Sequence, residues 1–177
     1  MWFCKCWPKG KFKKIIDDVR WNIGSNDGVD YIYNNISVSK FYELERSNNV
    51  GKICTTGNYC NDTVKRENTW QGKVGLMYPS DYGYATSDNC NDHNLYVWHN
   101  YSACYMNDWL YTSKNNWTIT SNAYKTTTTS SFGYGKRVSS SDVYDLYDVR
   151  PVVYLKSSVK LSSGIGSKDD PYILSES

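Results

Sequence analysis

The chain has 177 residues and a formal net charge of +2, from 20 basic and 18 acidic side chains. This length is enough for one domain with a buried core, and so balanced a charge gives no reason to expect a nucleic-acid partner or contact with a membrane surface. The 17 tyrosines and 7 tryptophans supply most of the bulky side chains, whereas alanine is rare. Tyrosine and tryptophan favour strands and binding surfaces, so this composition predicts a loop-rich β or α+β domain and argues against a helical bundle.

The N-terminal part of the chain predicts a short lead-in followed by two helices. Residues 1–12 are basic and aromatic without a regular period, so we interpret them as a leader or linker remnant and residues 13–177 as a single domain. Apolar residues at helical spacing predict a first helix over about residues 13–20, followed by a turn-rich stretch. A second amphipathic helix is predicted over about residues 38–47, with Ser37 or Ser39 as its N-cap.

The central stretch, residues 70–86, joins an apolar run to a polar turn. The run around residues 74–78 is bounded by Gly72 and Pro79 and is too short for a helix, so it predicts a buried strand that ends at Pro79. Ser80 and Asp81 can accept hydrogen bonds from nearby backbone N–H groups, and they predict a turn directly after this strand.

The six cysteines favour disulfides and an oxidising compartment, because an even number in a loop-rich polar chain is typical of disulfide frameworks. A cytoplasmic protein with reduced thiols is the alternative. Two pairs would each close a short loop: Cys54 with Cys60, and Cys90 with Cys104. Cys4 and Cys6 are too close together for a relaxed bridge between them, and their partners stay open.

The second half of the chain predicts a polar loop, an aromatic stretch and several short strands. Residues 87–94 form the loop, and residues 95–111 carry the aromatic side chains. A threonine run at residues 126–129 predicts either a strand edge or a loop, and glycines around residues 132–138 predict a hairpin. Strands of the β core are predicted at residues 74–78, 117–120, 134–138, 149–155 and 172–174.

Several spaced motifs together resemble a known domain type. They are WNIG (21–24), FYELER (41–46), GKVGLMYPSDYGYAT (72–86), NDWLY (107–111), WTIT (117–120) and VRPVVYLKSSVKLSSGIGSKDDPYIL (149–174). This set is similar to an extracellular domain of Gram-positive bacterial surface proteins, often found behind a pilin-like helix. Its C-terminal part is similar to the C-type lectin-like fold of formylglycine-generating-enzyme-like proteins. The resemblance covers roughly residues 20–175.

The resemblance implies an α+β, C-type lectin-like fold. In this fold two short helices flank a small, mainly antiparallel sheet with long, disulfide-pinned loops. The chain departs from calcium-dependent sugar-binding lectins, because it lacks their Glu-Pro-Asn or Gln-Pro-Asp tripeptide, and Asn107-Asp108-Trp109 has the residues of their Trp-Asn-Asp motif in another order. It shows no pilin-like leader helix and no reactive-cysteine motif of the formylglycine-generating type.

Aromatic side chains beside the polar loop are the candidate ligand-binding surface, because tyrosine and tryptophan stack on sugar rings and anchor protein contacts. The predicted ligand-binding residues are Tyr96, Trp98, Tyr101, Asp88, Asn91 and Asp92. Trp109 and Trp117 are predicted to pack in the core instead.

Two metal sites are conceivable, and neither is favoured. Cys90, His93, His99 and Cys104 have the ligand types of a zinc site, but the same two cysteines form the best disulfide pair. The polar loop is dense in oxygen donors that calcium accepts: Asp88, Asn89, Asn91, Asp92 and Asn94. We therefore predict no metal cofactor, with calcium possible.

The sequence predicts a noncatalytic binding or adhesion module of a bacterial cell-surface or pilus-associated protein, located outside the cell. The two histidines have no nucleophile elbow beside them, so no enzyme is expected. The expected partners are a surface protein or a glycan, of host or bacterial origin, with self-assembly possible; no apolar segment predicts membrane contact, and no export signal is visible. The alternatives are a structural pilin-like subunit and an enzyme relic of the formylglycine-generating type.

Overall fold

The computed structural model describes residues 12–23, 37–46, 69–86, 88–121, 128–133, 137–165 and 169–176. Within these ranges the chain is an α+β protein of short helices and small antiparallel sheets, as the composition predicts. The helices are α1 (Phe12–Ile15), α3 (Val38–Arg46), α4 (Pro79–Tyr84) and α5 (Ser102–Tyr105), with two 3₁₀ helices, η1 (Asp88–Cys90) and η2 (Leu95–Asn100). None of the helices in the described part of the chain is long and apolar enough to cross a membrane.

The strands form separate small sheets rather than one. They are β1 (Val19–Asn22), β2 (Thr69–Gly72), β3 (Gly75–Leu76), β4 (Asn116–Ser121), β5 (Thr128–Gly133), β6 (Arg137–Asp142), β7 (Pro151–Val152), β8 (Val159–Ser163) and β9 (Ile173–Glu176). The antiparallel pairs are β1 with β2, β3 with β7 and β8 with β9, and β4, β5 and β6 make a three-stranded sheet.

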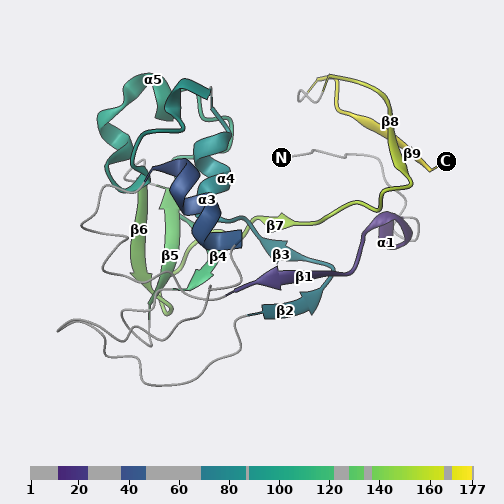
Figure 1. Cartoon of the computed structure of the whole chain (residues 1–177), viewed down its shortest axis with the longest axis horizontal. Coiled ribbons are helices and arrows are strands. Elements are labelled where there is room, and N and C mark those ends of the chain that lie inside the picture. Colours follow the sequence, from purple (N-terminus) through teal and green to yellow (C-terminus); the bar gives the residue numbers. More distant parts are fainter. Residues whose placement is uncertain are drawn as a thin grey trace.

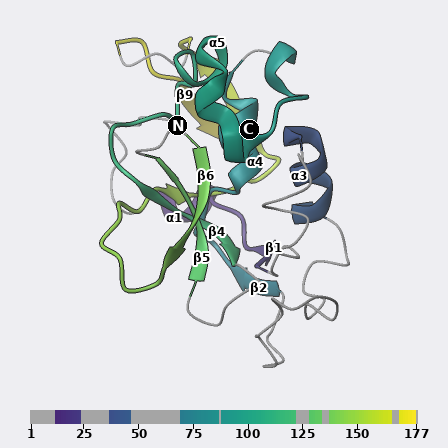
Figure 2. The same ribbon diagram turned by 90° about the vertical axis from the view of Figure 1, so that its left-hand side faces the viewer.

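The molecule has a body and an arm (Figure 1). The body contains α3, α4, α5 and the sheet of β4, β5 and β6. The arm contains α1 and the hairpin of β8 and β9, and β1, β2, β3 and β7 lie between the two parts. Figure 2 shows α5 above the three-stranded sheet, with α3 beside α4.

The hydrophobic core lies in the body, where the helices meet the sheet. Its buried members come from α3, from α4 and the residues beside it, from the segment 88–111 and from β6: Val38, Phe41, Met77, Tyr82, Ala85, Cys90, Leu95, Trp98, Cys104, Leu110 and Val138. A second contact region lies towards the arm, where the buried Trp21 packs on Tyr154 with 5.1 Å between the ring centroids.

The first helix is shorter than predicted, and the prediction of residues 13–20 as helix is wrong. α1 ends at Ile15, and Val19 already belongs to β1. The reason is a distant partner: the backbone of Ile15 accepts a hydrogen bond from Lys156 N at 2.9 Å, and Ile16 bridges Leu155. Pairing with residues 155 and 156 satisfies backbone hydrogen bonds in an extended conformation. The local spacing of apolar residues does not reveal this distant partner.

The second helix confirms its prediction closely. α3 runs from Val38 to Arg46, and Ser37 is the N-cap, because its hydroxyl accepts a hydrogen bond from Lys40 N at 3.3 Å. Val38 and Phe41 are fully buried on the apolar side that the spacing predicts.

The central stretch contains a helix where a turn was predicted. The strand is only Gly75–Leu76, and Pro79 begins α4 instead of a turn. Proline is favoured in the first turn of a helix, where its missing N–H would have no partner. The Asp81 carboxylate accepts a hydrogen bond from Tyr78 N at 2.9 Å and so caps the helix from its third position.

The later strands are confirmed in part. β4 contains the predicted residues 117–120, and β5 and β6 are antiparallel neighbours, as the hairpin prediction requires. The strand predicted at residues 149–155 is reduced to Pro151–Val152, because its only strand partner in the described chain, β3, is equally short. β1, β2 and β8 were not predicted, since each is held by a partner strand and not by a pattern of its own.

The cap as a candidate ligand-binding surface

Residues 88–111 form an irregular segment above the three-stranded sheet, which we call the cap. Cys90 at the end of η1 and Cys104 in α5 are joined by a disulfide with a Cα–Cα distance of 5.8 Å. This pairing confirms the prediction from the sequence. The other predicted pair, Cys54 with Cys60, and the two N-terminal cysteines lie outside the described residues.

Buried side chains fasten the cap to the body. Leu95 and Trp98 lie on either side of the kink that η2 has at Val97, and both are fully buried in the core. The side chain of Asn94 caps this 3₁₀ helix by accepting a hydrogen bond from Tyr96 N at 2.7 Å. The disulfide, the two apolar anchors and the Asn94 hydrogen bond together fix a chain segment that has little regular structure of its own.

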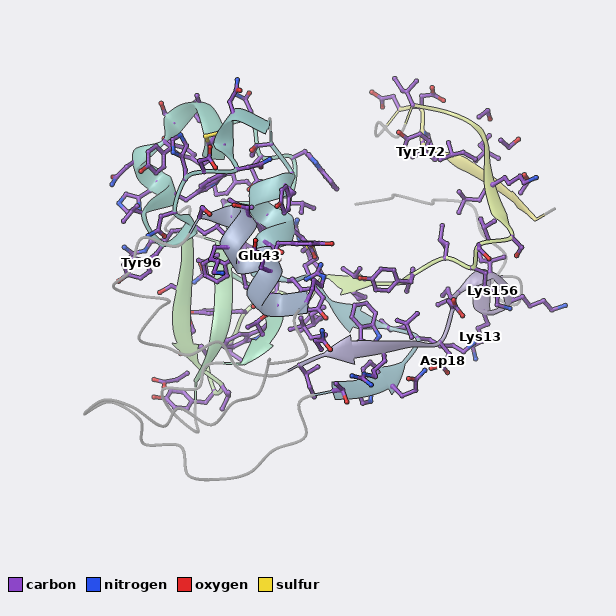
Figure 3. The ribbon with its side chains drawn as sticks, in the orientation of Figure 1. Lys13, Asp18, Glu43, Tyr96, Lys156 and Tyr172 are labelled. Atoms are coloured by element: carbon purple, nitrogen blue, oxygen red, sulfur yellow. A yellow bond between two sulfur atoms is a disulfide. The ribbon has the colours of Figure 1, made fainter. Side chains whose placement is uncertain are left out.

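Aromatic and basic side chains of the cap and of β6 are partly exposed. Tyr96 is half-buried, and the Arg137 guanidinium carbon lies 5.2 Å from the centre of its ring. Tyr101 packs against the core and also stacks on His93, with a centroid distance of 3.9 Å and nearly parallel rings. In Figure 3, Tyr96 is labelled at the edge of the molecule, between the cap and the beginning of β6.

The predicted polar residues of the site are spread around the beginning of the cap. Asp88 belongs to η1, and its side chain lies outside the described part. Asn91 is half-buried, and its backbone oxygen accepts a hydrogen bond from Ser39 N at 3.4 Å, which connects the cap to α3. Asp92 is exposed.

The two tryptophans of the cap have exchanged the roles that the sequence predicted. Trp98, predicted on the ligand-binding surface, is 0% exposed, whereas Trp109, predicted in the core, is 61% exposed. The reason is the turn at Asp108, whose carboxylate accepts a hydrogen bond from Leu110 N at 2.8 Å and so directs Leu110 into the core in place of its neighbour. An aspartate two residues before an apolar residue is the only local signal for this arrangement. Trp117, also predicted in the core, is half-buried.

The zinc alternative is wrong, because Cys90 and Cys104 are joined to each other and cannot act as thiolate ligands. The side-chain oxygen of Asn94, a donor in the predicted calcium loop, is already used as the cap of η2. Within the described ranges, no three side chains among His, Cys, Asp and Glu gather as a metal site requires.

Two carboxyl groups are buried, one within the cap and one on α3, and neither was predicted to be. Burial raises the pKa of Asp108 to about 7, and its Oδ2 atom has no hydrogen-bond partner among the described residues. Burial raises the pKa of Glu45, at the end of α3, to about 8, and its carboxyl group accepts a hydrogen bond from Ser80 N at 3.2 Å. Both carboxyl groups lie inside the protein. Their protonation therefore changes the stability of the fold, and they do not face a ligand.

Arg46 completes the contact between α3 and α4. Its guanidinium carbon lies 3.7 Å from the ring centre of Tyr78, and a guanidinium nitrogen lies 3.3 Å from the Asp81 carboxylate. The planar guanidinium suits both partners at once, since it stacks on a ring and pairs with a carboxylate in its own plane. The helices that support the cap are therefore fixed to each other by both charge and packing.

Comparisons with family models, with curated proteins and with solved structures find no match to this chain. The resemblance drawn from the sequence motifs therefore stays a prediction. What the protein does has to be inferred from the geometry of the cap.

Proposed function

We propose that the protein is a noncatalytic binding module of a bacterial cell surface, related to the C-type lectin-like fold, and that the cap binds a protein or glycan ligand. The observation that carries this proposal is the fixation of an irregular segment by a disulfide and two buried anchors, while Tyr96 and Tyr101 stay partly exposed and Asp92 and His99 exposed. A binding segment that is already ordered loses little conformational entropy when a ligand binds.

The Cys90–Cys104 disulfide supports a location outside the cytoplasm, because disulfides persist in oxidising compartments. The surface composition of the cap supports binding, since tyrosine, histidine and arginine combine an apolar body with a polar group. The ligand would contact the partly exposed Tyr96 and Tyr101 and the exposed Asp92, and the buried Trp98 packs edge-on against Tyr101.

An array of glycans and of bacterial and host surface proteins tests the proposal. We expect the oxidised protein to bind a discrete set of probes and Tyr96→Ala to weaken that binding by about 10-fold or more, as loss of an aromatic anchor does. Tyr144→Ala is the matched control, because Tyr144 is 75% exposed and follows the far end of β6. Equal effects of the two substitutions would exclude the cap as the binding surface.

Calcium is tested on the same arrays. Because Asn94 is already used within the fold, we expect binding to be the same with calcium and with a chelator. Binding that requires calcium would instead assign the polar loop at residues 88–94 a ligating role.

A structural, self-assembling role is the second candidate, and the arm favours it. The hairpin of β8 and β9 stands away from the body and leaves apolar side chains in solvent, with Leu161 52%, Ile173 57% and Ile165 74% exposed. Sheet edges with exposed apolar side chains are templates for association. Light scattering over a range of concentrations decides this point: a mass that stays that of one chain contradicts self-assembly.

A further inference from the structure

We propose that Tyr96, His99 and Arg137 together form a subsite for a sugar that carries a carboxylate, so that the ligand of the cap is an acidic glycan. This inference rests on the proposed function and specifies its ligand. We call these three residues the acidic-sugar subsite.

Arg137 supplies the charge. It begins β6, where its backbone is paired opposite Gly133 of β5, and its side chain is half-buried beside the cap. Within the described part of the chain, no carboxylate oxygen lies within 4.0 Å of its guanidinium nitrogens. Arg46 is the contrast, since it contacts both Glu45 and Asp81. Among the described residues, then, Arg46 has a counter-ion in Asp81, and Arg137 has none.

Tyr96 supplies a flat apolar surface beside that charge. The Arg137 guanidinium lies over its ring, and this cation–π contact helps to hold the cation beside the aromatic surface. Aromatic rings stack on the C–H faces of sugar rings, and a guanidinium donates two parallel hydrogen bonds to a carboxylate. A sugar acid presents both features within one ring.

His99 extends the subsite along η2. It follows Tyr96 by three residues on η2, which has a kink at Val97, whereas Leu95 and Trp98 of the same segment are buried in the core. His99 is exposed, as is its neighbour Asn100, so their polar groups can bond sugar hydroxyls.

The charge pattern favours a sugar acid over a polyanion. A nucleic acid or a phosphate polymer is bound by rows of lysine and arginine, whereas here one guanidinium lies beside one aromatic ring and the whole chain carries a net charge of only +2. A single carboxylate on a stacked ring matches one cation beside one aromatic side chain.

Matched pairs of oligosaccharides test the inference. The probes are sialyllactose against lactose, and an oligogalacturonate against its methyl ester, with tetraglutamate as a carboxylate that is not a sugar. We expect the protein to bind each acidic sugar about 10-fold more tightly than its neutral counterpart, with a preference that weakens as salt is added. Arg137→Gln should abolish the preference.

Arg20→Gln is the matched control, because Arg20 is an exposed arginine on β1, away from the cap. It should leave the preference intact. The unfolding midpoints of both variants are measured first. If Arg137→Gln does not fold, Arg137→Lys replaces it: this variant keeps the charge but not the paired donors, and we expect it to lose most of the preference.

The experiment distinguishes a failure of the acidic-sugar subsite from a failure of the proposed function. Equal binding of acidic and neutral sugars, or a preference that survives Arg137→Gln, overturns the acidic-sugar subsite but leaves the cap as a glycan-binding surface. If only tetraglutamate or surface proteins bind, the ligand is not a glycan, and the protein is a protein-binding module. If no array probe binds at all, both the inference and the proposed function are wrong.

Discussion

Glu45 shows how one residue can depend on its surroundings for its chemistry. Its side chain is 1% exposed, and both of its oxygens face Ser80, one accepting from the backbone N–H and the other bonded to the hydroxyl. Burial raises its pKa to about 8, although Arg46 and these hydrogen bonds act in the opposite direction. At neutral pH the group is therefore mostly a neutral carboxylic acid that joins α3 to α4.

The pKa of Glu45 predicts that the protein becomes less stable as the pH rises. The folded state holds the proton more tightly than the unfolded state, so the stabilisation is complete below the ordinary value of 4.5 and is lost as the pH rises through about 8. At about 1.4 kcal/mol per pKa unit, the loss amounts to a few kcal/mol. Urea unfolding at pH 5, 7 and 9 measures it.

Glu45→Gln separates this effect from others, because glutamine keeps the hydrogen bonds to Ser80 but cannot ionise. We expect the stability of this variant to be nearly constant between pH 7 and 9. Asp108 also has a raised pKa, of about 7, so it contributes to the loss of stability as the pH rises towards 7. Asp108→Asn should remove this contribution and leave that of Glu45. A wild-type protein as stable at pH 9 as at pH 5 would contradict the neutral state of Glu45.

Trp98 and Trp109 test the orientation of the cap. Trp98→Ala should lower the free energy of unfolding by about 3 to 5 kcal/mol, because it empties a fully buried site in the core. Trp109→Ala should change it by no more than about 0.5 kcal/mol, because the side chain is 61% exposed. Chemical denaturation of both variants measures the difference. If Trp109→Ala lost more stability than Trp98→Ala, Trp109 and not Trp98 would be the buried residue.

At the scale of elements, the closeness of α3 and α4 depends on Gly83. A methyl group added at Gly83 would lie 2.4 and 2.5 Å from the two methyl groups of Val38. Alanine is normally the better residue within a helix, by about 1 kcal/mol, but here the overlap with a buried, branched side chain decides the outcome. We expect Gly83→Ala to destabilise the protein by about 1 to 3 kcal/mol, measured by thermal or urea unfolding.

A double-mutant cycle shows whether this overlap is the cause. Val38→Ala alone should also be destabilising, because Val38 is fully buried in α3. Combined with Gly83→Ala, it makes room for the new methyl group, so the double variant should lose less than the sum of the two single losses. Simple additivity would mean that the overlap with Val38 is not the cause of the Gly83→Ala loss.

At the scale of the whole molecule, the arm and the body should differ in local stability. The strands β8 and β9 form a two-stranded sheet, and such a hairpin is marginally stable in water unless it packs on something larger. In the body, β6 pairs with β5 and contributes the fully buried Val138 to the core. The body is therefore the cooperative unit, and the arm opens more easily.

Hydrogen exchange with peptide-level resolution measures this difference. Amides of residues 159–163 and 173–176 should exchange through local opening, many-fold faster than amides of residues 137–142 and 38–46, which exchange mainly through global unfolding. Adding urea well below the unfolding midpoint should speed up the second group more than the first. Equal protection of the two groups would show that the arm folds as part of the body.

The sequence by itself determined the elements whose causes are local. α3 has its apolar spacing and its Ser37 cap within ten residues, β4 has alternating side chains, and the Cys90–Cys104 pair closes a short loop. The α+β class follows from composition. In each case the residues that decide the structure are neighbours along the chain, so a pattern is enough to find them.

Only the tertiary structure decided which residues of the cap face inward, and with what partners. Trp98 and Trp109 have the same side chain in equally aromatic surroundings, and the turn at Asp108 sets Leu110 inward in place of Trp109. Arg137 reaches Tyr96 from a strand about forty residues away along the chain, and Glu45 becomes a neutral acid only because α4 covers it. Burial and charge pairing depend on distances in space, which the spacing of residues in an irregular chain does not specify.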